Sequence, residues 1–185
     1  MQWLIFLPQL PASPSTLRVM VWRKMRAAGA LGLQNGVWVL PKTSDQKQLV
    51  EELLDYIQER GANSYIFGVS SLSQAIENDI LEKFRADRNE EYTEFCERCD
   101  ALLAELKKET SQKKFTFAEL EETEEDLQKL INWLGKIITR DFYNSQKRKI
   151  AEDKLELCQA AHQEFADEVY ACQGIDIANN FTKQK

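Results

Sequence analysis

Residues 13–41 carry the pattern of a helix followed directly by that of a β-hairpin, and this order restricts the folds open to the chain. Ser13 and Pro14 favour a helix start, because serine caps free N–H groups and proline loses no hydrogen bond at the first helical position. Gly29 is expected to end the helix. Between Pro14 and Gly29, apolar side chains recur at three- and four-residue spacing, which predicts one buried helix face. Its members are Leu17, Val21, Met25 and Ala28.

The hairpin is predicted from the dipeptide Asn35-Gly36, which lies between two apolar runs, residues 30–33 and 37–40. Asparagine and glycine tolerate the two positive φ angles of a two-residue hairpin turn better than other residues do. We therefore expect two antiparallel strands joined by a two-residue turn directly after the helix.

The flanking segments extend this pattern to a complete α+β domain. Residues 1–7 form an apolar run stopped by Pro8, residues 43–61 have a helical apolar face, and residues 64–69 form another short apolar run. The predicted order is strand, helix, strand, strand, helix, strand, which is that of a ferredoxin-like βαββαβ domain over residues 1–71. The first run is too short to span a membrane and no basic residue precedes it, so we expect a cytoplasmic protein without a membrane segment.

After Ser71 the apolar residues follow helical spacing only, which predicts a C-terminal antiparallel helical bundle over residues 72–173. A third helix is expected over about residues 145–172, and residues 174–185 are expected to form a flexible tail. The first two helices are predicted from these series: Ile80, Phe84, Arg88, Tyr92, Phe95, Cys99, Leu102 and Leu106, then Phe117, Leu120, Glu124, Leu127, Ile131, Leu134 and Ile138.

The charge of the chain is unevenly distributed. The net charge is −6, yet no acidic residue precedes Asp45, whereas five basic residues do: Arg18, Arg23, Lys24, Arg26 and Lys42. Such a local cationic patch fits an anionic partner. It equally fits a solvated helix face that neutralises acidic helices of the same molecule or of a dimer mate. The charge pattern alone leaves both interpretations open.

The candidate binding residues lie on the predicted helix that starts at residue 13. If the patch binds DNA, the residues expected to do so are Arg18, Trp22, Arg23, Lys24 and Arg26. The indole could stack on a base or a guanidinium, or it could pack over the edge of the sheet. Packing is the commoner role for such a tryptophan and is the interpretation that we favour.

The cysteines raise a second hypothesis. Cys96 and Cys99 form a CxxC motif, and Cys158 lies four residues before His162, which is the only histidine. Two antiparallel helices could offer these groups to a tetrahedral zinc ion. However, all of them lie on or beside apolar stripes, where a free cysteine behaves as a small hydrophobic residue. We favour the core role, expect no cofactor, and retain a zinc- or thiol-dependent sensor as an alternative.

No pattern in the sequence indicates an enzyme. The chain lacks a glycine-rich phosphate loop, a GxSxG motif and an HExxH motif. Its paired carboxylates fall on exposed helix faces, where they favour solubility.

Residues 16–41 closely resemble the start of the ChrB family, proteins encoded with bacterial chromate-efflux genes. Glu91-Tyr92 and Asp141-Phe142-Tyr143 are similar to later segments of that family. The resemblance is more distant to PaaX-type phenylacetate repressors and, in topology, to small CRISPR-associated ferredoxin-fold nucleases. The matching N-terminal residues are Arg18, Trp22, Arg23, Gly29, Ala30, Gly36, Val37, Trp38, Leu40 and Pro41.

The resemblance to ChrB implies a cytoplasmic, DNA-binding transcriptional regulator of chromate or metal-oxyanion resistance, with phosphate contacts from the cationic helix. Full-length members carry a C-terminal domain of comparable size after the helical bundle. Three interpretations therefore stay open: the chain regulates something other than chromate resistance, it acts only as a partner, or a separate sensing-domain protein works with it. Regulators are commonly symmetric, which makes a homodimer expected. The alternative is a protein-interaction or adaptor module without DNA binding. A magnesium nuclease of the CRISPR type is not expected, because no carboxylate precedes Asp45.

Overall fold

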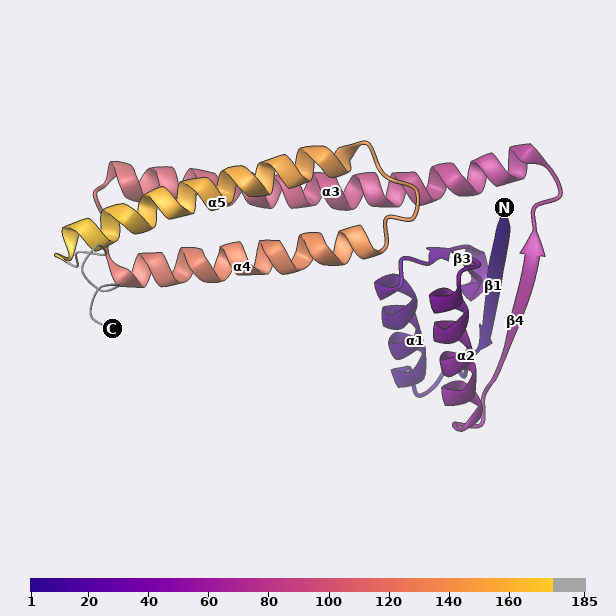
Figure 1. Ribbon diagram of the computed structural model, residues 1–185. Coiled ribbons are helices and arrows are strands. Elements are labelled where there is room, and N and C mark those ends of the chain that lie inside the picture. The colour runs from indigo at the N-terminus through magenta and orange to yellow at the C-terminus, as the bar shows by residue number, and fades with distance from the viewer. Residues whose placement is uncertain (175–185) are drawn as a thin grey trace, which may run out of the picture. The chain divides into compact units, whose positions relative to one another are not determined.

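The computed structural model describes residues 1–174, apart from the side chain of Asn35. Figure 1 shows the helices and strands in their order along the chain. A 3-10 turn, η1, separates β2 from β3. The elements are β1 Gln2–Gln9, α1 Thr16–Ala27, β2 Leu31–Gly32, η1 Gln34–Gly36, β3 Trp38–Pro41, α2 Ser44–Gln58, β4 Asn63–Ser70, α3 Gln74–Ser111, α4 Phe117–Thr139 and α5 Lys147–Cys172. The predicted mixture of a small sheet with a larger helical part is confirmed.

The chain divides into two compact units. The N-terminal unit comprises residues 1–88 and 139–143, and the bundle unit comprises the described residues 89–138 and 144–174. The helix α3 contributes to both units, and the domain boundary predicted between residues 71 and 72 stays a prediction. The flexible tail predicted for residues 174–185 lies outside the described residues, apart from Gly174.

The N-terminal unit is built on one four-stranded antiparallel sheet with the strand order β2-β3-β1-β4. The long strand β1 lies between β3 and β4, so that Leu4 pairs with Leu40 on one side and with Gly68 on the other. Side chains alternate between the two faces of a strand. Trp3 and Leu4 therefore belong to opposite faces of the sheet, and both are buried.

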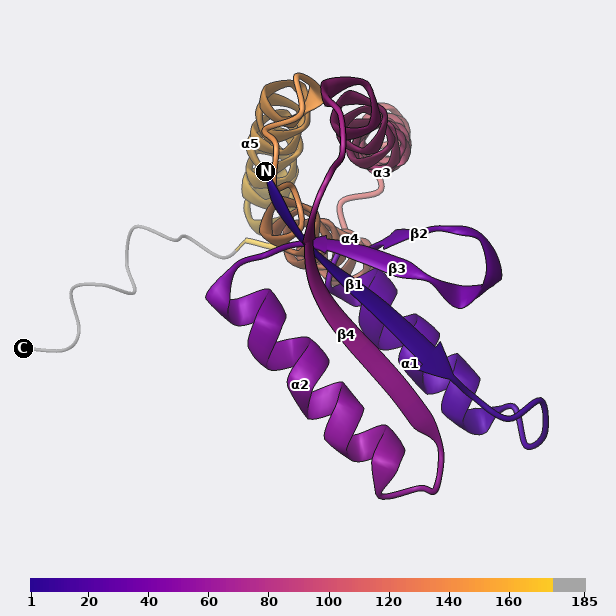
Figure 2. The ribbon, with the colours of Figure 1, turned by 90° about the vertical axis from the view of Figure 1, so that its right-hand side faces the viewer.

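The helices α1 and α2 cover one face of the sheet, and Figure 2 shows both on the same side of it. This face is apolar because the helices present the stripes that their sequences predict. The buried residues of this core are Leu4, Phe6, Val21, Met25, Ala30, Trp38, Leu40, Val50, Leu53, Ile57 and Ala62.

The opposite face of the sheet is covered by the first turns of α3 and by residues 139–143, an arrangement that the sequence analysis did not anticipate. Phe84 of α3 stacks on Trp3 of β1 with 5.9 Å between ring centroids. Phe142 and Tyr143 meet the ring of Phe84 edge-on, at centroid distances of 6.1 Å and 5.5 Å. Burial raises the pKa of Tyr143 to about 12, so its hydroxyl stays protonated at neutral pH.

Two local predictions about the first helix and the hairpin are wrong. Ser15, and not Ser13, occupies the N-cap of α1, and the Ser13-Pro14 peptide bond is cis. The hairpin loop is longer than the predicted two-residue turn, because Gln34–Gly36 forms a 3-10 turn closed by the Leu33 N–H donating to the Val37 carbonyl at 2.7 Å. Gly36 does adopt a positive φ of 77°, as expected of a loop that ends with a left-handed residue.

The bundle unit packs α4 and α5 with α3 around its own core. The predicted positions on α3 and α5 are largely confirmed, with Tyr92, Cys99 and Phe165 buried. On α4 the buried position is Thr123 and not the predicted Glu124, which is exposed. The Thr123 hydroxyl donates to the Glu119 carbonyl at 2.9 Å, so it enters the core without losing its hydrogen bond. No helix of the described chain is both long and apolar enough to cross a membrane.

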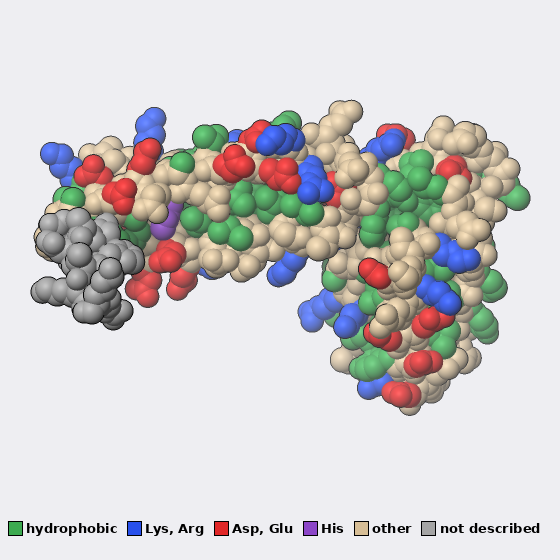
Figure 3. Space-filling model, in the orientation of Figure 1, with side chains coloured by type: hydrophobic (Ala, Val, Ile, Leu, Met, Phe, Trp, Pro, Cys, Tyr) green, Lys and Arg blue, Asp and Glu red, His purple; other side chains and the backbone are tan. Residues whose placement is uncertain are grey.

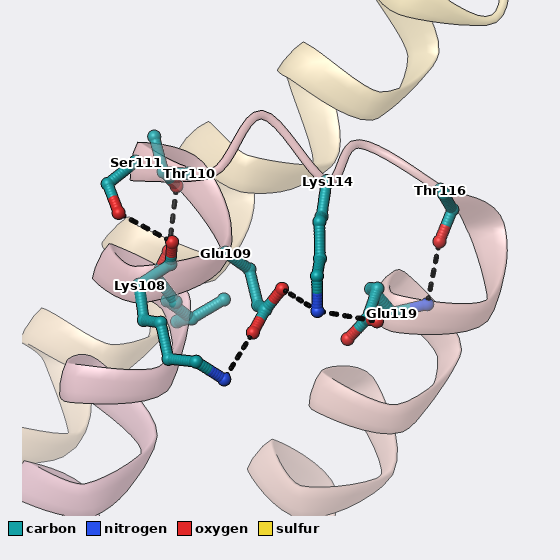
Figure 4. A network of polar contacts seen from close by, with 8 residues as sticks. Lys108, Glu109, Thr110, Ser111, Lys114, Thr116 and Glu119 are labelled. Atoms are coloured by element: carbon teal, nitrogen blue, oxygen red, sulfur yellow. Dashed lines mark hydrogen bonds and ion pairs between the residues drawn. The ribbon is translucent and has the colours of Figure 1, made fainter.

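A network of charged residues closes the turn between α3 and α4 (Figure 4). The side chain of Glu109 is 3% exposed, and its carboxylate accepts from the ammonium groups of Lys108 at 2.8 Å and Lys114 at 3.0 Å. Lys114 also approaches Glu119 in the first turn of α4, at 3.9 Å. Hydrogen bonds from Lys108 and Lys114 lower the pKa of Glu109 below 4.5.

Replacement of Glu109 by glutamine is expected to destabilise the bundle unit at neutral pH and to have little effect in acid. The stabilisation from the lowered pKa is present above pH 4.5, the unfolded value, and is lost as the pH falls through the folded value. Urea unfolding of both proteins from neutral pH to about pH 3, followed by circular dichroism, measures the difference. Glu121→Gln on the exposed face of α4 is the control, and an equal pH dependence in both variants would contradict the assignment.

Candidate functional site

The candidate site is the outer surface of α1. The side chains of Val21 and Met25 anchor the helix in the core, and they are 1% and 0% exposed. Because a helix has about 3.6 residues per turn, the side chains between them point outward. The predicted binding residues are accordingly on the surface, where Arg18, Trp22, Arg23 and Lys24 are exposed and Arg26 is half-buried.

Two of the predicted cations already have partners within the N-terminal unit. The guanidinium of Arg18 donates to the Ala12 carbonyl at 2.6 Å and so ties α1 to the loop before it. The guanidinium of Arg26 lies 3.3 Å from the Asp87 carboxylate of α3. The sequence analysis missed Asp87, because a contact across 61 positions leaves no local pattern. Arg26 is therefore less available to an external anion than its charge suggests.

Arg23 and Lys24 are the cations that remain available. Neither forms an ion pair with any residue that the structure describes. Both line a shallow depression of about 710 Å³, whose other walls come from the N-terminal half of α1 and Ala27. Lys24 also borders a smaller depression of about 280 Å³ between α1 and α2, beside Tyr56. Figure 3 shows Lys and Arg side chains on the side of the N-terminal unit where Figure 1 places α1.

Trp22 lies in solvent and not in the core. Its side chain is 55% exposed, so the indole lies at the surface, and both interpretations of its role, stacking and packing over the sheet edge, stay predictions. Val19, which the sequence analysis did not select, is 42% exposed. Trp22 and Arg23 follow Val19 by three and four residues, so all three share one stripe of α1. An indole left in water beside guanidinium groups provides a surface on which a planar group can stack.

The cysteines of the alternative hypothesis lie in the bundle unit. Cys99 of α3 and Cys158 of α5 are fully buried, and the Cys158 thiol donates to the Cys99 carbonyl with the sulfur 3.5 Å from the oxygen. A hydrogen bond between the two thiols, together with burial, raises the pKa of Cys99, and the same hydrogen bond lowers the pKa of Cys158. Burial also raises the pKa of Cys96. Thiols that resist ionisation, as Cys96 and Cys99 do, are poor nucleophiles and poor metal ligands. For Cys158 it is the complete burial in the core that favours packing.

His162 completes the set considered for zinc. It is half-buried on α5, four residues beyond Cys158. Within residues 1–174, the structure brings together no group of three or more Cys, His, Asp or Glu side chains able to hold a metal ion. Cys96, Cys99, Cys158 and His162 thus belong to the same bundle without forming a coordination site in the described chain.

Comparison with known proteins decides the family. The family model described as "Protein ChrB, N-terminal" matches residues 18–175, which include most of α1 and every later element. The chain belongs to the ChrB N-terminal family. The Protein ChrB of Cupriavidus metallidurans is 30% identical over 95 residues, a region that covers 50% of this chain. The resemblance to ChrB found in the sequence is confirmed.

The same region covers only 28% of the length of the Cupriavidus ChrB. Membership of the ChrB N-terminal family therefore concerns this domain and not the activity of a whole ChrB protein. The match does begin at Arg18, so all the candidate residues of α1 lie inside the region that defines the family.

Proposed function

We propose that this chain is a ChrB-type transcriptional regulator associated with chromate or metal-oxyanion resistance, and that it binds DNA through α1. Membership of the ChrB N-terminal family supports the regulatory role. The observation that carries the DNA proposal is the exposed Trp22 beside Arg23 and Lys24, two cations without acidic partners in the described chain.

The chemistry of this surface suits a nucleic-acid backbone. Lysine and arginine neutralise phosphates and release condensed counterions, which supplies most of the affinity for DNA. A chain of net charge −6 needs a local cationic surface for this purpose, and α1 carries no acidic residue. The guanidinium of Arg18 uses one donor on Ala12, so its other donors remain for a phosphate. Stacking on Trp22 would add contact to an unpaired or splayed base.

We propose to class the N-terminal sheet as ferredoxin-like. The element order is β1-α1-β2-β3-α2-β4 and the strand order is β2-β3-β1-β4, with both helices on one face. This agrees with the split βαβ arrangement expected from the sequence. In such a unit α1 packs on the sheet with one face, and the side chains of its other face, such as Trp22 and Arg23, are exposed.

We propose a role without catalysis. The α1 surface offers cations and an indole, which bind, but no paired acid and base. The strand β1 ends at Gln9 without a carboxylate nearby in the sequence, unlike the magnesium nucleases that share this topology. The chromate-sensing part is proposed to belong to a separate domain or protein, since the Cupriavidus relative is much longer than the matched region.

Replacement of Arg23 and Lys24 together by alanine is expected to weaken DNA binding and to flatten its salt dependence. The slope of log affinity against log salt should fall by about 0.9 for each phosphate that is no longer neutralised. Fluorescence anisotropy measures this with a labelled duplex from upstream of the protein's own gene and a scrambled duplex. Tighter binding to the upstream duplex would support sequence recognition.

Arg98→Ala with Lys107→Ala is the matched control, because it removes the same charge from exposed positions of the bundle unit. It should leave the salt slope nearly unchanged. Trp22→Ala should lower affinity without changing the slope, since stacking releases no counterions. Unchanged affinity after loss of Arg23 and Lys24, with circular dichroism intact, would refute the α1 interface. Failure of every form to bind would instead favour the protein-interaction module.

A further inference from the structure

Cys99 of α3 and Cys158 of α5 meet in the core of the bundle unit, where the two helices lie side by side (Figure 1). Both residues are 0% exposed. The sulfur of Cys158 lies 3.5 Å from the backbone carbonyl oxygen of Cys99, so a side chain of one helix touches the main chain of the other. The two thiols also share a hydrogen bond. Both sulfurs therefore belong to one contact between the helices.

The helices α3 and α5 approach each other closely at this contact. The distance between packed helices depends on the side chains between them, and Ala151, two turns before Cys158, is also small and fully buried. One turn before Cys158, the ammonium of Lys154 lies 2.5 Å from the Asp100 carboxylate of α3. A disulfide needs such an approach, since its Cα atoms are less than about 7 Å apart.

The CxxC motif offers a different pair of thiols, Cys96 and Cys99, but the helix keeps these two apart. Residues three positions apart on a helix have Cβ atoms about 5–6 Å from each other. A disulfide requires a Cβ separation of about 3.5–4.5 Å. Because α3 is continuous from Gln74 to Ser111, the two thiols of the motif cannot join without unwinding it. The fold therefore favours the pair that bridges two helices.

We propose that Cys99 and Cys158 form an oxidation site, at which a hydroperoxide converts the packed thiols to a disulfide that joins α3 to α5. In the reduced protein the pair is part of the core. In the oxidised protein it is a covalent link between residues 59 positions apart. A link that closes so long a loop restricts the unfolded chain and stabilises the bundle unit. The inference does not rest on DNA binding, since α1 belongs to the other unit.

Cys158 is the thiol that reacts first, because the hydrogen bond from Cys99 lowers the pKa of Cys158 and favours its thiolate. With hydrogen peroxide, the thiolate attacks one oxygen, the O–O bond breaks, and a sulfenic acid and one water form. The Cys99 sulfur then attacks the Cys158 sulfur. The S–S bond forms, the S–O bond breaks, and hydroxide leaves with the Cys99 proton as a second water. Two thiols are oxidised and one peroxide is reduced.

The second step follows from the first. The hydrogen bond to Cys158 is the main cause of the raised pKa of Cys99, and this bond to a thiolate no longer exists once Cys158 is a sulfenic acid. Because both sulfurs are fully buried, the oxidant reaches them when the bundle opens locally. We therefore expect a slower reaction than at Cys172, which is exposed.

Peptide mapping of the oxidised protein tests the proposal. The variant Cys172→Ser removes the exposed thiol and keeps the other three. Trypsin cleaves after Arg98, so Cys96 and Cys99 fall on different peptides, and Cys158 falls on a third. The folded variant is treated with hydrogen peroxide, its remaining thiols are alkylated, and the digest is analysed by mass spectrometry.

The expected product is the Cys99 peptide joined to the Cys158 peptide, with Cys96 alkylated. The urea midpoint of the bundle unit should rise on oxidation and return to its first value with dithiothreitol. Cys158→Ala in the same background is the control, and it should keep both remaining thiols free and show no shift of the midpoint.

Three results would overturn the proposal. One is that all three thiols stay free after the treatment. Another is a link between Cys96 and Cys99. The last is a mixture of all pairings in similar amounts, which is the pattern of oxidation in an unfolded chain. The peptide map of Cys172→Ser decides between these results and the expected one without the Cys158→Ala variant, so the test does not depend on how well that variant folds.

Discussion

Replacement of Gly29 by alanine is expected to destabilise the N-terminal unit by about 2–5 kcal/mol, because the added methyl group meets two separate costs. Gly29 ends α1 with a φ of +73°, a conformation that disfavours any Cβ. A Cβ at this position would also lie 2.4 Å from Cβ of Arg140 and 3.2 Å from its carbonyl oxygen. Neither atom is at the end of a flexible side chain, so the backbone would have to move.

Urea unfolding of the variant measures this cost, and Gly61→Ala is the matched control. Gly61 follows α2 with nearly the same φ, +72°, and no described atom lies within 4 Å of the place that an added methyl group would take. Only the backbone conformation should then contribute, about 1–2 kcal/mol. Equal losses in the free energy of unfolding at the two positions would contradict this explanation. They would show that the close approach of Gly29 to Arg140 adds nothing to the cost of the methyl group.

Replacement of Phe84 by alanine is expected to cost about 3–5 kcal/mol, the range for large aromatic residues removed from a core. Phe84 is 3% exposed and is the ring that contacts Trp3, Phe142 and Tyr143. Its removal leaves a cavity between the sheet and the first turns of α3. The stacked pair with Trp3, at an interplanar angle of 7°, would also disappear.

Thermal unfolding and near-ultraviolet circular dichroism measure the effect of removing Phe84. Phe117→Ala serves as the comparison, because Phe117 is 42% exposed and its ring meets that of Tyr170. A partly exposed ring buries less area, so its removal should cost less than half as much. Similar destabilisation in both variants would mean that the aromatic cluster does not hold α3 on the sheet.

Much of the fold could be predicted because its determinants are close together along the chain. The buried faces of α1 and α2 follow from three- and four-residue spacing, and Gly29 and Gly61 end their helices as glycines with positive φ. The length of the hairpin loop, by contrast, was not predicted correctly from the local sequence. Asn35-Gly36 favours a two-residue turn, but the pairing of Leu31 with Val39 requires the longer loop.

In the candidate site, too, some features follow from the local sequence and others depend on distant contacts. The sequence located the cations on α1, but their availability depends on partners elsewhere in the chain. Arg26 is paired because Asp87 comes close after 61 positions, and Trp22 is exposed because no element of the described N-terminal unit covers it. The prediction for the cysteines needed only local spacing and is confirmed, since Cys99 and Cys158 were expected in the core and are buried there.

The sequence by itself determined the positions of the helices and strands, the cationic character of α1 and the relation to the ChrB family, because these depend on local spacing and residue type. Only the tertiary structure decided which surfaces are left open. The covering of Trp3 by Phe84, the pairing of Arg26 and the exposure of Trp22 all depend on contacts between distant segments. Packing of this kind minimises exposed apolar area over the whole unit, and no short segment of sequence contains that information.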